Sequence, residues 1–322
     1  MTGGSGYVGS STVRELAAAG HEIVIYDNLS TGHRKLSKGF ELVEGDIADG
    51  NKLAPILNQV DAVLHFAASA YVGESVTNPR KYFHNNVESA IALLDSVLES
   101  KVGLFVFSST CAVYGIPESL PIVESSPKEP INPYGTTKLF FERALSAYSV
   151  SHGLRFVALR YFNAAGAHPC GTIGEIHDPE THLIPLALRA ALGRGAALTV
   201  FGNDLDTPDG TCVRDYIHVA DLASAHVKAL EYLVRGGTSV SLNLGTGKGT
   251  SIAEVIRVIE EASGRKLPHV YAPPRSGDPP ALYANPARAK EVLGWEAKYE
   301  IQSIIRDALR WEEQLPAYLS TE

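Results

Sequence analysis

Cysteine is scarce in this sequence: Cys111, Cys170 and Cys212 are the three present, and no two of them form a C-x-x-C pair. The odd count argues against a disulfide framework, the spacing against the common zinc motifs, and a reducing cytosol fits best. The eleven histidines lack H-x-x-x-H or similar spacing, so no metal is expected. No apolar run reaches roughly 18 residues and no signal-peptide pattern is seen, which predicts a cytoplasmic protein without membrane spans.

Positive charge is also sparse. Lysine and arginine total 28 against 36 acidic residues, a formal net charge of −8, and no basic block occurs. Binding to nucleic acid or to an anionic membrane is therefore not expected. Disorder is not expected either, because 45% of the residues are hydrophobic, enough for a sizeable core. The length of 322 residues suggests roughly two domains.

The first half of the chain alternates short β-rich segments with helical ones. The expected strands are 21–26, 40–44, 62–66, 104–108 and 156–161. The expected helices are 10–19, 52–59, 80–100 and 133–151. Continuous apolar strands separated by helices predict the α/β class, with a Rossmann-type doubly wound parallel sheet.

The texture of the sequence changes after about residue 165, where a smaller C-terminal substrate-binding lobe is expected. Loops rich in glycine, proline and aspartate appear at 167–181, 202–211 and 272–280, and a short strand at 198–201. An amphipathic helix at 219–234, a strand at 241–244 and a closing helix at 301–315 complete the pattern. The predicted division is a first domain at 1–165, to which 214–247 return, and a lobe at 166–322.

A glycine-rich turn lies at the start of the sequence, where Gly3, Gly6 and Gly9 form G-x-x-G-x-x-G. Glycine lets backbone N–H groups approach a pyrophosphate at a helix N-terminus. The strand that follows the helix ends at Asp27, about 20 residues on, where a carboxylate accepts ribose hydroxyls. Because such an acid would repel a 2′-phosphate, the pattern favours NAD over NADP. Arg34 and Lys35, close to Asp27, weaken the preference for NAD. Asp46 ends the next expected strand, at a place suited to the adenine.

The strand that should precede the glycine turn is short in the sequence. A dinucleotide fold places a strand directly before the first glycine, usually in the middle of the sheet, yet Met1 and Thr2 are all that precede it here. We therefore expect a truncated first strand, a gap in the sheet, and low stability or weak retention of NAD.

Tyr134 and Lys138 form Y-x-x-x-K within an expected helix that begins near Pro133. Residues at i and i+4 share one helix face, and a nearby ammonium lowers the pKa of a phenol. Tyr134 is thus a candidate general base for an alcohol that is being oxidised. The segment 108–110 offers hydroxyls at the carboxyl edge of the sheet, where ligands of such folds bind. The alternative is an exposed tyrosine on a surface helix.

Several longer motifs carry a resemblance to a known family. They include TGGSGYVG, SSTCAVYG, PYGTTK, LRYFNAAGAHP, DGTCVRDYIHVADLA and RSGDPP. The sequence resembles the UDP-glucose 4-epimerases of the extended short-chain dehydrogenase/reductase superfamily from residue 2 almost to its end. The resemblance implies a tightly held NAD that is reduced and reoxidised within each turnover, a UDP-sugar substrate, and a homodimer formed through the helices at 80–100 and 133–151.

The resemblance also implies roles for individual residues. Tyr134 would be the base, Lys138 its electrostatic partner and anchor of the nicotinamide ribose, and Thr110 the hydroxyl that bridges substrate and base. Cofactor contacts would come from Gly3, Gly6, Tyr7, Val8, Asp27, Asn28, Asp46, Ile47, Phe66, Ala67, Ala68, Asn85, Tyr134, Lys138 and Phe162. Substrate contacts would come from Thr110, Tyr134, Asn163, His182, Leu183, Thr199, Val200, Phe201, Arg214, Tyr216, Arg275, Asp278 and Leu282.

Two of these assignments have an independent chemical basis. Arg214 and Arg275 suit a diphosphate, since a guanidinium binds phosphate oxygens in a bidentate manner. Two alternatives stay open beside UDP-glucose: the 4-epimerisation of UDP-N-acetylglucosamine, UDP-arabinose or UDP-glucuronate, and a non-catalytic NAD-binding regulator. Cys111 and Ala112 follow Thr110 where a dehydratase carries acidic residues, which argues against elimination.

Overall fold

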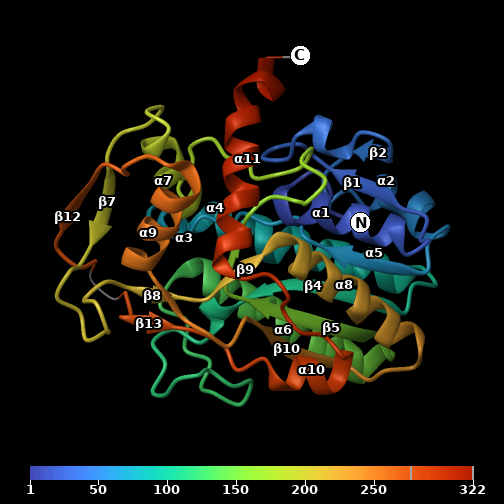
Figure 1. Ribbon diagram of the computed structural model, residues 1–322. Coiled ribbons are helices and arrows are strands. Elements are labelled where there is room, and N and C mark those ends of the chain that lie inside the picture. The colour runs from blue at the N-terminus through green and yellow to red at the C-terminus, as the bar shows by residue number, and fades with distance from the viewer. Residues whose placement is uncertain (276–277, 321–322) are drawn as a thin grey trace.

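A parallel sheet lies at the centre of the computed structural model, which describes residues 1–275 and 278–320 (Figure 1). Four strands run in the order β10-β5-β4-β3, and β1 and β2 pair beside them, all in parallel. Their bounds are β1 Val24–Asp27, β2 Glu41–Glu44, β3 Ala62–His65, β4 Leu104–Thr110, β5 Arg155–Tyr161 and β10 Val240–Leu244. The predicted Rossmann-type α/β class is confirmed.

Residues 1–3 lie between β1 and β3 and connect the two parts of the sheet. Thr2 bridges in parallel to both Tyr26 and His65. Its backbone N–H donates to the carbonyl of Leu64 at 3.0 Å, and the N–H of Gly3 donates to Tyr26 at 3.0 Å. The strand expected before the glycine turn is therefore a single bridging residue, and it closes the expected gap at the carboxyl end of the sheet.

Helices cover both faces of the sheet because the side chains of each strand alternate between the faces. Along β4, Leu104 and Val106 pack in the core beneath α1 and α8, whereas Phe105 and Phe107 pack in the core beneath α2, α5 and α6. The bounds are α1 Tyr7–Ala18, α2 Gly50–Leu57, α5 Ser89–Glu99, α6 Pro133–His152 and α8 Val219–Val234. Every residue of β4 is buried, which explains its continuous apolar pattern.

The helix expected at 80–100 is present as an unbroken run from 79 to 99, but a π turn lies inside it. The chain forms α3 Val72–Thr77, α4 Pro79–Phe83, a π-helical segment at His84–Glu88, and then α5. Such a π turn adds a residue to the helix and is frequent at functional sites. Short 3₁₀ turns occur at Arg34–Ser37 and Cys111–Val113.

The second part of the chain builds small sheets and a core of its own. Strand pairs are β6 with β9, β7 with β12, and β8 with both β11 and β13. The strands are β6 Asn163–Ala165, β7 Leu198–Phe201, β8 Val213–Arg214, β9 Tyr216–His218, β11 Thr250–Ser251, β12 His269–Ala272 and β13 Ala281–Leu282. The helices are α7 Leu183–Ala191, α9 Ile252–Ser263, α10 Ala287–Leu293 and α11 Ile301–Ser320. Ser276 and Gly277, in the loop expected at 272–280, lie outside the described residues.

Helix α11 lies between this lobe and the large sheet (Figure 1). It packs against α7 and α9 through the lobe core, and its Trp311 and Leu315 pack against Leu36 of the first domain. It is longer than the closing helix expected at 301–315. Among the helices of residues 1–275 and 278–320, none has the length and apolar character needed to cross a bilayer.

A buried ion pair fixes α6 against the sheet. The Nε of Arg160 on β5 lies 2.9 Å from a carboxylate oxygen of Glu142 on α6, and both side chains are 5% exposed. The Ser109 hydroxyl donates to the same carboxylate at 2.5 Å. Arg160 also donates to the Tyr114 hydroxyl at 2.8 Å, and that hydroxyl donates to Asn243 on β10 at 2.7 Å. This network ties one helix to three strands.

Candidate active site

The glycines of the turn before α1 are of two kinds: two have no room for a side chain, and one is open to a ligand. Gly3 has a φ of +72°, and a Cβ added there would lie 2.4 Å from the backbone nitrogen of Ala67. A Cβ at Gly9 would lie 2.2 Å from the carbonyl oxygen of Gly3. At Gly6, the N-cap of α1, the nearest protein atom outside the adjacent residues is 3.4 Å from such a Cβ. The backbone at Gly6 is thus available to a pyrophosphate at the N-terminus of α1, which fits a bound dinucleotide.

Three predicted polar residues come together at the carboxyl ends of β1 and β2. The buried carboxylate of Asp27 accepts hydrogen bonds from the backbone N–H of Ser5 and of Leu29, both at 2.9 Å. The Asn28 amide donates to the Asp46 carboxylate at 3.1 Å. The carboxylate expected at the ribose therefore also holds the glycine turn in place.

The remaining predicted cofactor residues surround the same edge of the sheet. Tyr7 is buried and its hydroxyl donates to the carbonyl of Gly166 at 2.5 Å. Val8 is half-buried on α1, Ile47 is buried after β2, and Phe162 is buried after β5. Phe66, Ala67 and Ala68 follow β3, and Asn85 lies in the π-helical segment, where its amide reaches the Ser69 hydroxyl at 3.4 Å.

Asn86 is a positioning residue that the sequence reasoning missed. It is buried, accepts from the backbone N–H of Ser69 at 2.8 Å, and donates to the Ser69 carbonyl at 2.9 Å. Its amide also donates to the Thr137 hydroxyl at 3.2 Å. It therefore ties the loop after β3 to α6. The Asn-Asn pair inside an otherwise amphipathic helical pattern is the signal that could have identified it.

Helix α6 begins where the candidate base must be placed. The Asn132 side chain accepts from the Gly135 N–H at 2.8 Å as N-cap, and Pro133 is the first helical residue. A Cβ at Gly135 would lie 2.5 Å from the carbonyl oxygen of Ala112, so glycine allows the helix to approach the end of β4. This approach, also missed from sequence, brings Tyr134 close enough to Thr110 for the Thr110 hydroxyl to favour the phenolate.

Burial dominates the electrostatics of the two central groups. It raises the pKa of the Tyr134 phenol well above its usual value, while the neighbouring Thr110 hydroxyl opposes that shift. Burial also lowers the pKa of Lys138 to about 7. The ammonium donates to the Ser108 carbonyl at 2.8 Å. The expected lowering of the phenol pKa is therefore not achieved by the protein's own groups, because burial disfavours the phenolate more than the neighbouring groups favour it.

Several residues predicted to contact the substrate lie on β6, β8, β9 and β13. Arg214 on β8 stands opposite Leu282 on β13, and its Nη2 is 3.3 Å from the Asp278 carboxylate. Tyr216 on β9 pairs with Asn163 on β6. Arg214 also lies close enough to Cys111 for its charge to oppose the effect of burial, which raises the pKa of that thiol to about 12. The charge of Arg214, the diphosphate candidate, therefore acts on the residue that directly follows Thr110.

The other predicted substrate residues are arranged less uniformly. The Arg275 guanidinium lies 3.9 Å from the centre of the Phe201 ring, a stacked arrangement. On the same strand, Val200 is fully buried in the lobe core, so only its backbone is offered to a ligand, while Thr199 is exposed. His182 precedes Leu183 at the start of α7, but its ring turns towards Glu175.

Comparison with known proteins identifies close relatives. Residues 1–245 match the sequence pattern of the NAD dependent epimerase/dehydratase family. The chain is 52% identical over 316 residues to a UDP-glucose 4-epimerase of Rhizobium meliloti, covering 98% of this chain and 96% of that one. A crystal structure of UDP-glucose 4-epimerase from Brucella ovis in complex with NAD is 52% identical, has a TM-score of 0.94 and covers 96% of each chain. A UDP-glucose-4-epimerase from Stenotrophomonas maltophila with bound NAD and formylated UDP-arabinopyranose is 39% identical, with a TM-score of 0.96 over 98% of each chain.

Proposed function

The chain belongs to the NAD dependent epimerase/dehydratase family, and from that premise we propose that it is a UDP-glucose 4-epimerase that interconverts UDP-galactose and UDP-glucose. The observation that carries the proposal is the meeting of Tyr134, Thr110 and Lys138 at the carboxyl edge of the sheet. High identity to named epimerases over nearly the whole chain supports the same reaction.

NAD would supply the hydride acceptor, and then the hydride donor, at C4 of the sugar. The chain's part is to bind, orient and move a proton. Tyr134 accepts the proton of the sugar 4-hydroxyl and later returns it, with Thr110 holding that hydroxyl in line. The ammonium of Lys138 favours the phenolate and holds the nicotinamide ribose. Because the protein's own surroundings disfavour the phenolate, proton removal depends on the positive charge that arrives with the cofactor.

Inversion at C4 requires the 4-keto sugar to present its other face. We infer that Arg214 and Arg275 anchor the diphosphate while the hexose makes few contacts, so that the sugar can turn while it remains bound. The proposed division of labour is NAD binding by 1–165 with 214–247, and UDP-sugar binding by 166–322. The pairing of β10 with β5 and the separate lobe core support this division.

The decisive experiment is incubation of the purified chain with UDP-galactose, followed by identification of the product. We expect UDP-glucose to form until equilibrium is reached. Parallel incubations with UDP-N-acetylgalactosamine, UDP-arabinose and UDP-glucuronate would show which sugars are accepted. Bound NAD without epimerisation of any UDP-sugar would contradict the proposal and favour a regulator.

Homodimerisation and a cytoplasmic location are part of the same proposal. Large apolar side chains on the helices expected to form the dimer are exposed: Phe83 is 43%, Phe140 50% and Val150 91% accessible. A second copy would cover such side chains. Light scattering coupled to size exclusion should give twice the chain mass, and a monomer at micromolar concentration would contradict this part. The scarcity of cysteine supports the cytoplasm.

A further inference from the structure

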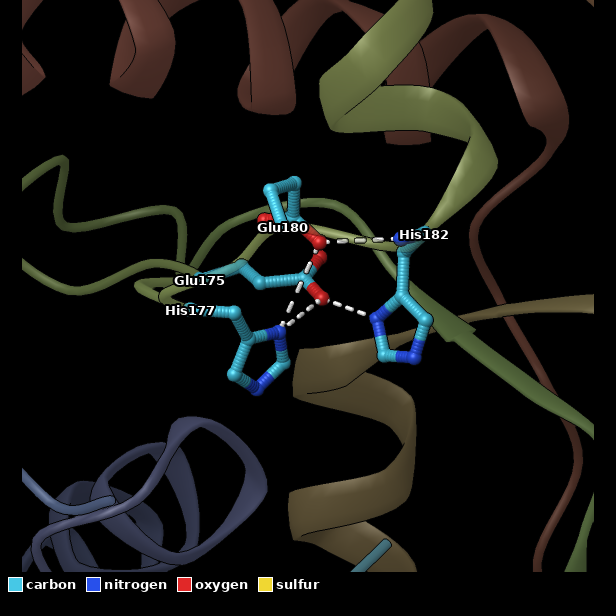
Figure 2. A group of neighbouring side chains, drawn as sticks. All are labelled: Glu175, His177, Glu180 and His182. Carbon is cyan, nitrogen blue, oxygen red and sulfur yellow. Dashed lines mark hydrogen bonds and ion pairs between the residues drawn. The ribbon is translucent and has the colours of Figure 1, made fainter. Parts of the chain in front are cut away.

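We propose that Glu175, His177, Glu180 and His182 form a binding site for one divalent metal ion of the Zn²⁺ type. The four side chains belong to the segment between β6 and α7 and converge on one point (Figure 2). One ligand atom from each, two imidazole nitrogens and two carboxylate oxygens, lies within 4.8 Å of all the others. The histidine spacing alone shows no metal motif in the sequence, because glutamates alternate with the histidines in the order E-x-H-x-x-E-x-H.

The donor set indicates the class of ion. Both histidines present Nδ1 to the same oxygen, Oε1 of Glu175: that of His177 at 2.9 Å, and that of His182 in closer contact. The Nδ1 of His177 also lies 3.6 Å from Oε1 of Glu180. Neutral imidazole together with carboxylate is a ligand set typical of Zn²⁺, whereas Mg²⁺ and Ca²⁺ prefer oxygen ligands alone.

Two buried atoms of the cluster have no hydrogen-bond partner. They are Nδ1 of His177 and Oε2 of Glu180, whose side chain is 2% exposed. Nδ1 of His177 is close to Glu175, yet the contact does not have hydrogen-bond geometry. The Arg189 guanidinium is 3.7 Å from Oε2 of Glu180, an ion-pair distance only. A buried polar atom without a partner costs free energy, and a cation between the ligands would give Nδ1 of His177 the partner that it lacks.

The backbone around the cluster is fixed by contacts that do not involve the proposed ion. Oε1 of Glu180 accepts the backbone N–H of Thr181 at 2.8 Å and of His182 at 2.9 Å. The carbonyl of Glu175 accepts the indole N–H of Trp311 on α11 at 2.9 Å. Ligands held in this way need little rearrangement on binding, which favours affinity.

The position of the cluster suggests what the ion would do. The His177 ring makes edge contacts with the rings of Tyr7 on α1 and Tyr71, at 6.5 and 5.5 Å between ring centres. His182 is the residue directly before α7. An ion shared by these side chains would therefore fasten the start of α7 to the first domain, a structural role with no part in the chemistry at C4. This inference does not depend on the proposed epimerase reaction.

The test measures metal content and stability of the full chain with its cofactor. The protein is treated with a chelator, dialysed against equimolar Zn²⁺, and its metal content is determined by mass spectrometry. We expect about one Zn²⁺ per chain and a rise in melting temperature, since a ligand that binds only the folded state stabilises it. Co²⁺ in place of Zn²⁺ should give the intense visible absorption of a tetrahedral site.

Variants separate this site from adventitious binding. H177Q and E180Q should each weaken Zn²⁺ binding at least about tenfold, the loss expected even for outer-shell partners. H84Q is the matched control, because the exposed His84 pairs with Glu88 at 3.2 Å and offers a surface i, i+4 metal site. Circular dichroism and the melting temperature without metal show whether each variant folds. Unchanged Zn²⁺ binding in folded H177Q and E180Q, or loss of binding in H84Q alone, would overturn the proposal, as would a wild-type chain that retains no Zn²⁺.

Discussion

The ammonium of Lys138 lies 5.9 Å from the centre of the Tyr134 ring, one turn further along α6. It is held there by the Ser108 carbonyl at 2.8 Å, and the hydroxyl of Thr110, at the end of the same strand, lies close enough to the phenol to favour the phenolate. One helix face and one strand end therefore determine the arrangement of all three groups. The following predictions test this arrangement and the two binding regions beside it.

Tyr134→Phe should lower kcat for UDP-galactose by roughly 10²- to 10⁴-fold, the usual contribution of a general acid or base. Binding of UDP should be unchanged, because the nucleotide is held elsewhere. Steady-state kinetics and calorimetric titration with UDP measure the two quantities. Tyr148→Phe, which removes an exposed hydroxyl bonded to Asp95, is the control and should leave both unchanged. Full activity in the Tyr134 variant would remove this residue from the mechanism.

Lys138→Met should change how stability depends on pH. Burial lowers the pKa of Lys138 to about 7 in the folded chain, against about 10.4 for an unfolded lysine. Between these values the unfolded chain binds more protons, so the wild type gains stability as pH rises, by at most about 1.4 kcal/mol per pH unit. The variant should therefore be the more stable protein at pH 6, and its advantage should shrink towards pH 10.

This pH dependence is measured by urea unfolding of both proteins after removal of the cofactor, so that the ammonium has no cofactor partner. Lys101→Met, at an exposed position, should run parallel to the wild type over the same range. A constant difference between the Lys138 variant and the wild type from pH 6 to 10 would show that the ammonium is not destabilised by burial.

Gly6→Ala and Gly9→Ala should have different effects within one turn. The Cβ at Gly9 meets a backbone oxygen at 2.2 Å, so the loop must shift, at a cost of about 1 to 3 kcal/mol in the free energy of unfolding. The Cβ at Gly6 has its nearest protein atom at 3.4 Å and should leave the melting temperature of the cofactor-free protein nearly unchanged. It should instead obstruct the pyrophosphate and weaken NAD binding. Equal losses of stability in both variants would contradict this distinction.

Arg214→Leu should weaken UDP binding with little effect on NAD. Removing one member of a desolvated charge pair costs about 2 to 5 kcal/mol, which corresponds to a rise in Kd of roughly 30-fold or more. Titration with UDP and with NAD gives both affinities. Arg257→Leu removes an exposed arginine paired with Glu261 and should change neither. A Kd for UDP that stays within error of the wild type would place the diphosphate elsewhere.

The sequence predicted local order better than long-range contact. A buried strand such as β4 can be recognised in the sequence as a continuous apolar run. The predicted Rossmann-type fold, the family and its NAD cofactor are confirmed. The π turn inside the helix expected at 80–100 was missed, since the residues around it keep a helical pattern. The need for glycine at position 135 was missed because the atom that a side chain there would meet belongs to Ala112, more than 20 residues earlier in the chain.

The predicted site shows the same limit. The residue types at positions 110, 134 and 138 indicated the chemistry, and the structure places these side chains together, while their roles stay predictions. The roles predicted for the residues that would bind the UDP moiety also stay predictions. The expectation of no metal rested on histidine spacing alone, and the convergence of two glutamates with two histidines was visible only after folding.

The face of α6 that carries Tyr134, Lys138 and Glu142 has a consequence for the precision of the site. These residues recur every fourth position, and together they contact the consecutive positions 108–110 of β4. If the helix slipped along the strand by one residue, all three contacts would be lost at once, and Glu142 and Arg160 would be left as unpaired charges in an apolar core. The position of the candidate base on the strand therefore cannot shift gradually. Substitutions nearby should lower the population of folded molecules, while the molecules that remain folded keep the phenol in the same place.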